Sequence, residues 1–251
     1  MKKRLLLGVS LSVGLAASAF AESHVTVYLP EQAGSVTVDG ARNLSELVMN
    51  PALFNRTWWP GTVIATPQAT VQQQAVKQAV LASLSALAAA FRQDDDGDLA
   101  AAADNLHQQV SQLTVTGRQF VPLDPDNIRI YPEHNRRLDG EYSVYTLQRP
   151  ATVRLFGLRE NSGPQPFVPG QDVKTYLDNH APLAGYDKNQ VWLIQPDGTT
   201  RQVPVAYWNH RHAEAAPGST LFVGFSAHAL PSAYRDLNLR ILALLTNRVP
   251  D

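Results

Sequence analysis

Apolar and polar residues alternate with a period of two in the first part of the chain. Residues 24–29 (HVTVYL) and 35–40 (SVTVDG) follow this pattern, and Pro and Gly residues bound them. Such alternation between turn signals is typical of half-buried strands, so we predict an antiparallel pair. A short helix-like stretch at 43–54 and a strand candidate at 58–67 come next.

A helical pattern then interrupts the strands at about 66–113. This region is rich in Ala, Gln and Leu, which favour helices, and Thr66 and Pro67 suit the N-cap and the first helical position. Residues 93–98 break the pattern, so the sequence predicts a hairpin of two helices. The apolar face of the first helix recurs every three or four residues: Val76, Val80, Leu84, Leu87 and Phe91.

After this hairpin the chain returns to short strands. Residues 113–132 contain two strand candidates separated by Pro122 and the Asp-Pro-Asp stretch at 124–126. The second half then follows the order strand, strand, helix, strands, which is the order of a β-grasp module. Residues 36–48 and 166–177 form a weak internal repeat. The predicted segments are strands at 142–147, 151–158 and 219–225, a turn and short helix at 167–183, and a β-hairpin at 191–209 through Asp197 and Gly198.

The amino terminus has the three parts of a secretory signal peptide. Lys2, Lys3 and Arg4 are basic, residues 5–17 are apolar, and residues 19–21 read Ala-Phe-Ala. A membrane anchor is the alternative, but a span needs about 20 apolar residues. We therefore expect cleavage after residue 21 and a location in the periplasm of a Gram-negative bacterium.

Composition excludes several classes of protein. The signal peptide holds three of the 21 basic residues and none of the 22 acidic residues, which leaves the mature chain a net charge of −4. This balance does not favour nucleic-acid binding. With 0 Cys, the fold cannot use disulfides or thiol chemistry.

The residues between about 153 and 225 resemble those of a known family. The segments RLFGLRENSGPQPFVPGQDVKTYL, VWLIQPDG, AYWN and PGSTLFVGF occur in this order. The chain resembles the capsule-biosynthesis GfcC-like family, periplasmic proteins of group 4 capsule operons, which is related to the β-grasp modules of outer-membrane polysaccharide exporters. The resemblance implies an α+β fold with a β-grasp domain at 22–141 that carries the helical hairpin as an insertion, a second at 142–230, and a carboxy-terminal amphipathic helix at 231–251.

The carboxy-terminal segment has an apolar stripe at helical spacing. The stripe is too short to span a bilayer. It can pack on the chain's own second domain, dock on a protein partner, or lie on a membrane surface as an interfacial helix. The resemblance favours docking, because a terminal helix in the related exporters assembles with its neighbours. The stripe consists of Tyr234, Leu237, Ile241, Leu244 and Leu245.

No recognisable catalytic or phosphate-binding motif occurs in the sequence, and we expect no metal or cofactor. The acidic stretch at 94–98 lacks the outer ligands of a calcium-binding EF-hand loop. His210, His212 and Glu214 are candidate metal ligands, although exposed or structural histidines are the favoured interpretation. A carboxylate pair of the kind that glycosidases use is an open alternative, with candidates Glu31, Glu133, Glu141 and Asp172.

Aromatic side chains and one arginine suggest glycan binding. Indole and phenol rings stack on sugars while their polar atoms form hydrogen bonds, and Trp58 and Trp59 are the main candidates, because Trp192 lies inside an apolar strand. Tyr207 and Trp208 are further candidates. Arg118 follows Gly117 where the helical hairpin returns, and its guanidinium suits the carboxylate or phosphate of an acidic polysaccharide. A surface arginine, or one paired with Asp124 or Asp126, is the alternative.

These observations lead to one main functional hypothesis. The chain is expected to be a non-enzymatic periplasmic accessory protein of capsule or exopolysaccharide assembly or export, with the polysaccharide and an outer-membrane export protein as partners. The alternatives are a periplasmic polysaccharide-modifying enzyme and a docking protein that touches no glycan.

Overall fold

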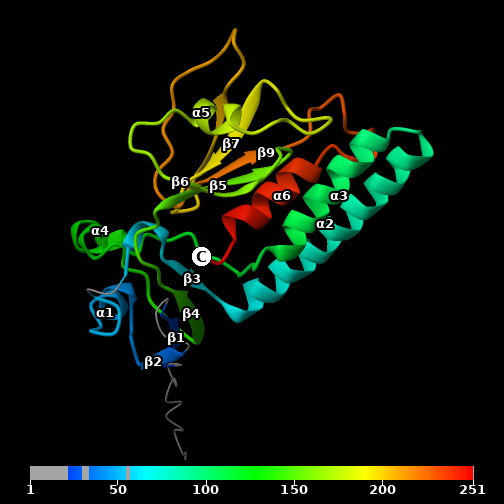
Figure 1. Cartoon of the computed structure of the whole chain (residues 1–251). Coiled ribbons are helices and arrows are strands. Elements are labelled where there is room, and N and C mark those ends of the chain that lie inside the picture. Colours follow the sequence, from blue (N-terminus) through cyan, green and yellow to red (C-terminus); the bar gives the residue numbers. More distant parts are fainter. Residues whose placement is uncertain (1–21, 30–33, 55–56, 251) are drawn as a thin grey trace, which may run out of the picture.

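The described part of the chain contains two β-sheets, each covered by helices (Figure 1). The computed structural model describes residues 22–29, 34–54 and 57–250. The fold is therefore of mixed α and β type. The predicted signal peptide and Glu31 lie outside the described residues.

The first sheet has four strands in the order β2-β1-β4-β3. The two central strands, β1 and β4, are parallel, and each outer strand pairs antiparallel with its neighbour. The predicted pairing of the first two strands is confirmed, with Val25 opposite Val38. The strands are β1 (His24–Tyr28), β2 (Ser35–Asp39), β3 (Val63–Ala65) and β4 (Glu141–Tyr145).

One face of this sheet forms a small core with two short helices, α1 (Leu44–Val48) and α4 (Pro125–Ile130). Alternation along the strands places Val25 and Val27 in this core, beside Leu47 of α1. Single 3-10 turns, η1 (Trp59–Gly61) and η2 (Pro132–His134), precede β3 and follow α4.

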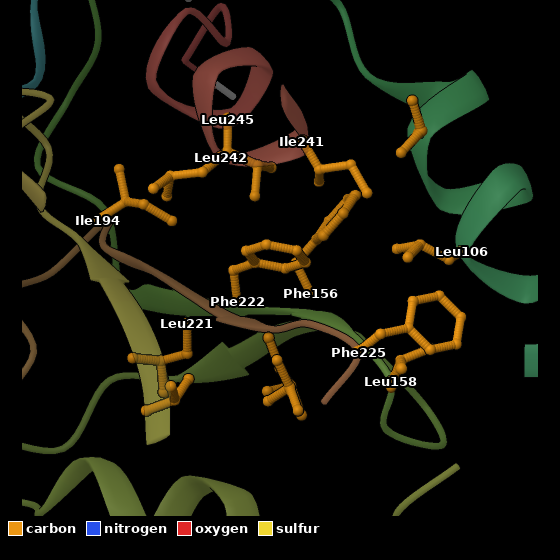
Figure 2. Close-up of a cluster of buried hydrophobic side chains, with 14 of the residues drawn as sticks. Leu106, Phe156, Leu158, Ile194, Leu221, Phe222, Phe225, Ile241, Leu242 and Leu245 are labelled. Carbon is orange, nitrogen blue, oxygen red and sulfur yellow. The ribbon is translucent and has the colours of Figure 1, made fainter. Parts of the chain in front are cut away.

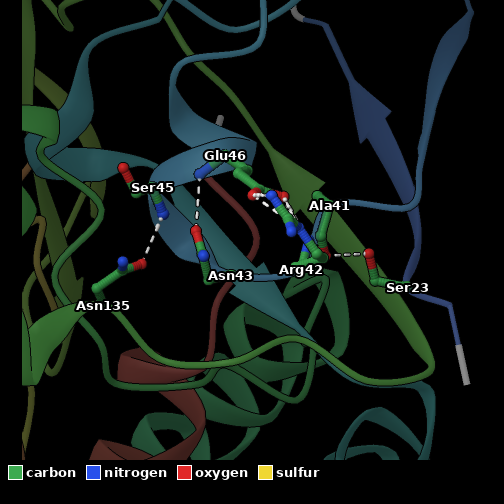
Figure 3. A network of polar contacts seen from close by, with 7 residues as sticks. All are labelled: Ser23, Ala41, Arg42, Asn43, Ser45, Glu46 and Asn135. Carbon is green, nitrogen blue, oxygen red and sulfur yellow. Dashed lines mark hydrogen bonds and ion pairs between the residues drawn. The ribbon is translucent and has the colours of Figure 1, made fainter. Parts of the chain in front are cut away.

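Polar contacts fix the start of α1 (Figure 3). The side chain of Asn43 caps the helix by accepting a hydrogen bond from the Glu46 amide at 3.0 Å. The Glu46 carboxylate in turn accepts from the amide of Arg42 at 2.8 Å and from its Nε at 2.9 Å. The Ser45 amide donates to Asn135 Oδ1 at 2.9 Å, which ties α1 to the segment that leads into β4.

The second sheet has five strands in the order β6-β5-β9-β7-β8, again with two parallel strands, β5 and β9, as neighbours. The hairpin predicted at 191–209 is confirmed as β7 and β8. In its turn Gly198 has a positive φ of 88°, whereas Asp197 does not. The elements are β5 (Thr152–Gly157), β6 (Gly163–Pro166), α5 (Val173–Asp178), β7 (Gln190–Ile194), β8 (Thr200–Pro204) and β9 (Thr220–Val223).

The two halves share a plan that the weak sequence repeat already indicated. In each half an antiparallel strand pair leads through a glycine with positive φ, Gly40 or Gly170, to a short helix. A polar side chain caps each helix, Asn43 for α1 and Asp172 for α5. The last strand of each half, β4 or β9, returns parallel to the first. The strand predicted at 142–147 is β4 and pairs with β1 and β3, so its assignment to the second half is wrong.

The predicted helical hairpin is present as α2 (Pro67–Gln93) and α3 (Gly97–Gln112). It lies between β3 and β4 in the chain, yet its apolar face packs into the core of the second sheet. Leu84, Leu87 and Leu106 are fully buried there, and Figure 2 shows Leu106 in this core. By length and composition α2 is the one described helix that could cross a membrane, but a core helix meets the same criterion.

The carboxy-terminal helix α6 (Leu237–Thr246) lies between the hairpin and the second sheet (Figures 1 and 2). Its stripe faces Phe156 and Phe222 of the sheet, and a 3-10 turn, η3 (Ser232–Tyr234), precedes it. Packing on the chain's own domain, one of the alternatives that the sequence left open, is therefore what the structure contains. The expected docking residues Leu237, Ile241, Leu244 and Leu245 are at most 3% exposed, and Tyr234 is half-buried against the same core, so the stripe is not available to a partner or a membrane.

The strand prediction for residues 113–132 is wrong in its second part. Residues 125–130 form α4, because Asp124 caps the helix by accepting from the amides of Asp126 and Asn127, and Pro125 occupies the first turn. The first part makes only isolated bridges, Val115 with Arg248 and Arg118 with Ala65.

We expect Leu244→Ala to lower the free energy of unfolding by about 2–5 kcal/mol, because Leu244 is fully buried between the hairpin and the second sheet. Leu239→Ala is the matched control on the same helix, since Leu239 is 58% exposed and should change stability by less than about 0.5 kcal/mol. Urea unfolding followed by circular dichroism measures both. Equal effects would contradict the burial of the stripe.

Candidate functional site

A cavity of about 80 Å³ lies where the two sheets, the return of the helical hairpin and the carboxy-terminal segment meet. Trp58 and Val63 line it from the first half, and Arg118 lines it from the returning segment. From the second sheet, Arg154, Thr220 and Ile194 form one wall. The cross-strand register explains this wall, because Thr220 of β9 is the partner of both Arg154 and Ile194.

Arg118 is held in this cavity by contacts from three parts of the chain. Its amide donates to Asn247 Oδ1 at 3.1 Å, just after α6, and its backbone bridges to Ala65 of β3. Its Nη2 donates to the carbonyl of Pro196 in the β7–β8 turn at 2.9 Å. The guanidinium carbon also lies 5.5 Å from the centroid of the Phe120 ring, a cation–π distance. Neither predicted partner, Asp124 nor Asp126, forms a hydrogen bond or ion pair with Arg118 among the described contacts.

Gly117 makes this placement possible. A Cβ at residue 117 would lie 2.3 Å from the backbone of Ala69 and Thr70 at the start of α2. The Gly117 amide donates to Thr70 Oγ1 at 2.9 Å. The close approach that a glycine permits therefore brings the next residue, Arg118, against β3 and the junction.

The surroundings of Arg118 favour an anion. Burial lowers the pKa of its guanidinium to about 10, nearby Asp197 raises it in part, and the positive charge of Arg248 lowers it further. The group is still protonated at neutral pH. A bound carboxylate or phosphate would favour the charged form of this partly buried cation, and a guanidinium can hold either with two parallel hydrogen bonds.

The two tryptophans separate, as residues adjacent in an extended chain would. Both are half-buried, but Trp58 lines the arginine cavity, whereas Trp59 packs against the core of the first sheet. The Trp58 amide donates to the carbonyl of Leu147 at 2.7 Å, and Gly61 lies close beneath its ring. Of the predicted pair, only Trp58 is therefore placed beside Arg118.

Sequence reasoning missed two further arginines of this cavity, Arg154 and Arg248. Arg154 had a local signal, because it is the one charge in the apolar strand at 151–158. Arg248 had none, since its position depends on a backbone bridge to Val115, more than a hundred residues earlier.

The predicted histidine candidates come together at a separate place, around the cap of α5. Asp172 Oδ2 lies 2.7 Å from His210 Nε2 and 3.5 Å from His212 Nδ1, and His212 Nε2 lies 3.1 Å from Glu214 Oε1. Over the residues that the structure describes, no group of three or more such side chains is arranged to hold a metal ion. The geometry is that of ion pairs that tie the β8–β9 loop to α5.

The remaining candidates do not line the arginine cavity. Glu133 and Glu141 are exposed in the first half. In the second half Trp192 is half-buried against the core, and Tyr207 and Trp208 are 100% and 75% exposed in the β8–β9 loop.

The histidine cluster predicts a pH effect. The hydrogen bond with Glu214 raises the pKa of His212, burial opposes this, and the charges of Asp172 and Glu214 add to the rise. The pair therefore contributes stability below the unfolded His pKa of about 6.5, and this contribution is lost as the pH rises through the folded value.

We expect the His212 ring to titrate above pH 6.5 in an NMR titration, and Glu214→Gln to bring its midpoint down. Glu133→Gln, an exposed carboxylate in the first half, is the control and should leave the midpoint unchanged. An identical His212 midpoint in the wild-type and Glu214→Gln proteins would refute the pairing.

Comparison with known proteins places the chain in a family. The family model described as "Capsule biosynthesis GfcC, N-terminal" matches residues 21–149, and the one described as "Capsule biosynthesis GfcC C-terminal" matches residues 161–250. The uncharacterized protein YjbG of Escherichia coli (strain K12) is 42% identical over 250 residues, and the match covers 100% of both chains. The protein therefore belongs to the GfcC family of capsule-biosynthesis proteins.

Proposed function

We propose that this protein is a non-enzymatic accessory protein of capsule or exopolysaccharide assembly or export, and that the arginine cavity binds an acidic group of the glycan. The observation that carries the proposal is the convergence of Arg118 and Trp58 in one cavity at the junction of the two sheets. Membership of a capsule-biosynthesis family supports the role in capsule assembly.

The chemistry of the cavity suits a charged sugar. A guanidinium pairs with the carboxylate of a uronic acid or with a phosphate substituent. The indole of Trp58 offers an apolar face for the sugar ring beside it. Together these groups recognise a ring and its charge at once, which neither does alone.

We further infer that each half is a β-grasp unit. In support, each half has two neighbouring parallel strands inside its sheet and an antiparallel strand pair before a short helix. In both halves a polar side chain caps that helix. The helical hairpin would then be an insertion between β3 and β4, at the place where the second half has β8 between β7 and β9.

The proposed place of action is the periplasm, for which the signal-like residues 1–21 are the support. The expected partners are the polysaccharide and a protein of the outer-membrane export machinery. Because the stripe of α6 is buried, such a partner would have to contact another surface. Deletion of residues 232–251 would remove part of the core, so a loss of partner binding in that variant would not distinguish docking from unfolding.

A polysaccharide-modifying enzyme is the second candidate function. Glycoside hydrolysis needs two carboxylates across the scissile bond. Among the described residues that line the arginine cavity there is no Asp or Glu. Asp172 is the candidate carboxylate for such chemistry. Its burial tends to raise its pKa, but the hydrogen bonds that it accepts from the Lys174 amide and from His210 lower the pKa overall. Loss of glycan cleavage in Asp172→Asn, with binding kept, would favour the enzyme.

Surface polysaccharide in a deletion strain tests the main proposal. We expect the deletion to reduce surface polysaccharide, the full-length chain to restore it, and Arg118→Ala to fail to restore it. Arg118→Lys should restore it in part, because an ammonium keeps the charge but not the paired hydrogen bonds.

Arg129→Ala is the matched control, since Arg129 is an exposed arginine that pairs with Asp126 outside the cavity. Immunoblots and thermal unfolding would establish that each variant is folded and present at the same level. Full restoration by Arg118→Ala would sink the proposed role of the cavity, and unchanged polysaccharide in the deletion strain would sink the proposed function.

A further inference from the structure

A second and larger cavity adjoins the arginine cavity. The two cavities share four lining residues, Arg154, Pro164, Arg248 and Pro250. The larger one extends from these residues toward the end of α3 and the β5–β6 edge of the second sheet. We call these two adjoining cavities together the junction groove.

The two ends of the junction groove differ in size. The arginine end measures about 80 Å³ and the far end about 400 Å³. Ligand pockets for small molecules usually measure about 300–1,000 Å³. The narrow end can therefore take a carboxylate and the edge of the ring that carries it beside Trp58, while the wide end has room for further sugar rings.

The wide end has the polar groups that sugar hydroxyls require. Gln112 and Thr114, at the end of α3, are exposed on one side of it. Gly163 of β6 also lines this end, and no atom lies within 4 Å of the position of a Cβ there, so the cavity is open beside its backbone. Amides and hydroxyls suit neutral sugar hydroxyls, as the arginine end suits an anion.

The walls of the groove are fixed by backbone contacts. The amide of Val249 donates to the carbonyl of Thr114 at 2.9 Å, and the amide of Thr116 donates to the carbonyl of Asn247 at 2.8 Å. Gln109 accepts from the Gly157 amide at 2.8 Å and donates to its carbonyl at 2.9 Å, which holds α3 against β5. A preformed groove of this kind binds an extended ligand without the entropic cost of ordering its own walls.

We propose that the junction groove binds an acidic oligosaccharide of more than one sugar, with an anionic group at Arg118 and the neighbouring sugars along Gln112 and Thr114. This inference rests on the proposed function and adds the length and orientation of the ligand. The contacts in the wide end are hydrogen bonds to a second and third sugar, so affinity must rise with chain length.

Isothermal titration calorimetry with galacturonic acid and trigalacturonic acid tests the inference, with maltotriose as the neutral trisaccharide. We expect the charged trisaccharide to bind about tenfold more tightly than the monosaccharide, since one or two added hydrogen bonds contribute about 1–2 kcal/mol. Maltotriose should bind far more weakly, because it lacks the carboxylates.

Variants separate the two ends of the groove. Arg118→Ala should abolish binding of both charged sugars. Gln112→Ala combined with Thr114→Ala should weaken the trisaccharide several-fold and leave the monosaccharide unchanged. Gln108→Ala is the matched control, because Gln108 is an exposed glutamine on α3 that does not line the groove.

Each outcome decides a different point. Equal affinity for the charged monosaccharide and trisaccharide, with Arg118→Ala inactive, would overturn the extended groove and leave the proposed glycan binding standing. Tight binding of maltotriose would overturn the acidic ligand class. Absence of binding to all three sugars would overturn the inference, and the surface-polysaccharide assay would then decide the proposed function separately.

Discussion

Burial of the apolar face of α6 is the interaction on which the rest of the structure depends. This face fills the space between the helical hairpin and the second sheet, where Ile241, Leu244 and Leu245 share one core cluster with side chains of both. Figure 2 shows Ile241 and Leu245 facing this core. Because non-polar area removed from water stabilises by about 25 cal/mol per Å², a continuous core of this kind outweighs any single polar contact in the molecule. It also joins segments from the two halves of the sequence in one core.

The arginine cavity inherits its geometry from this core. The chain leaves α6 at Asn247, whose side chain accepts a hydrogen bond from the amide of Arg118. The next residue, Arg248, lines the cavity. The first sheet contributes Trp58 through η1, and the β7–β8 turn contributes the carbonyl that orients the guanidinium. The site is thus assembled from segments that meet only when both halves have packed, which explains why it lies at their junction.

Local features of this fold could be predicted from sequence, because local rules determine them. The periodicity of the hairpin helices, the capped helix after each glycine turn, and the β7–β8 turn all depend on residues close in the chain. Residues 125–130 form a helix where a strand is predicted, because the Asp124 cap and Pro125 start a helix at a place that reads as a turn between strands.

The packing partners of these elements, which lie far away in the sequence, could not be predicted in the same way. An amphipathic stripe such as that of α6 shows that one face must be buried, but not against what. The same limit applies to the cavity: Arg118 and Trp58 could be chosen by chemistry, but their meeting with Arg154 and Arg248 depends on backbone pairing across the whole chain.

The position of the helical hairpin in the chain has a consequence for how the protein folds. A chain that emerges from its amino terminus presents α2 and α3 long before residues 237–245, which complete their core, have appeared. Contacts that wait for distant residues form slowly, and in the meantime the apolar face of the hairpin is open to solvent and to other chains. Until residues 237–245 are present, this exposed apolar face is the part of the chain most prone to association with other chains.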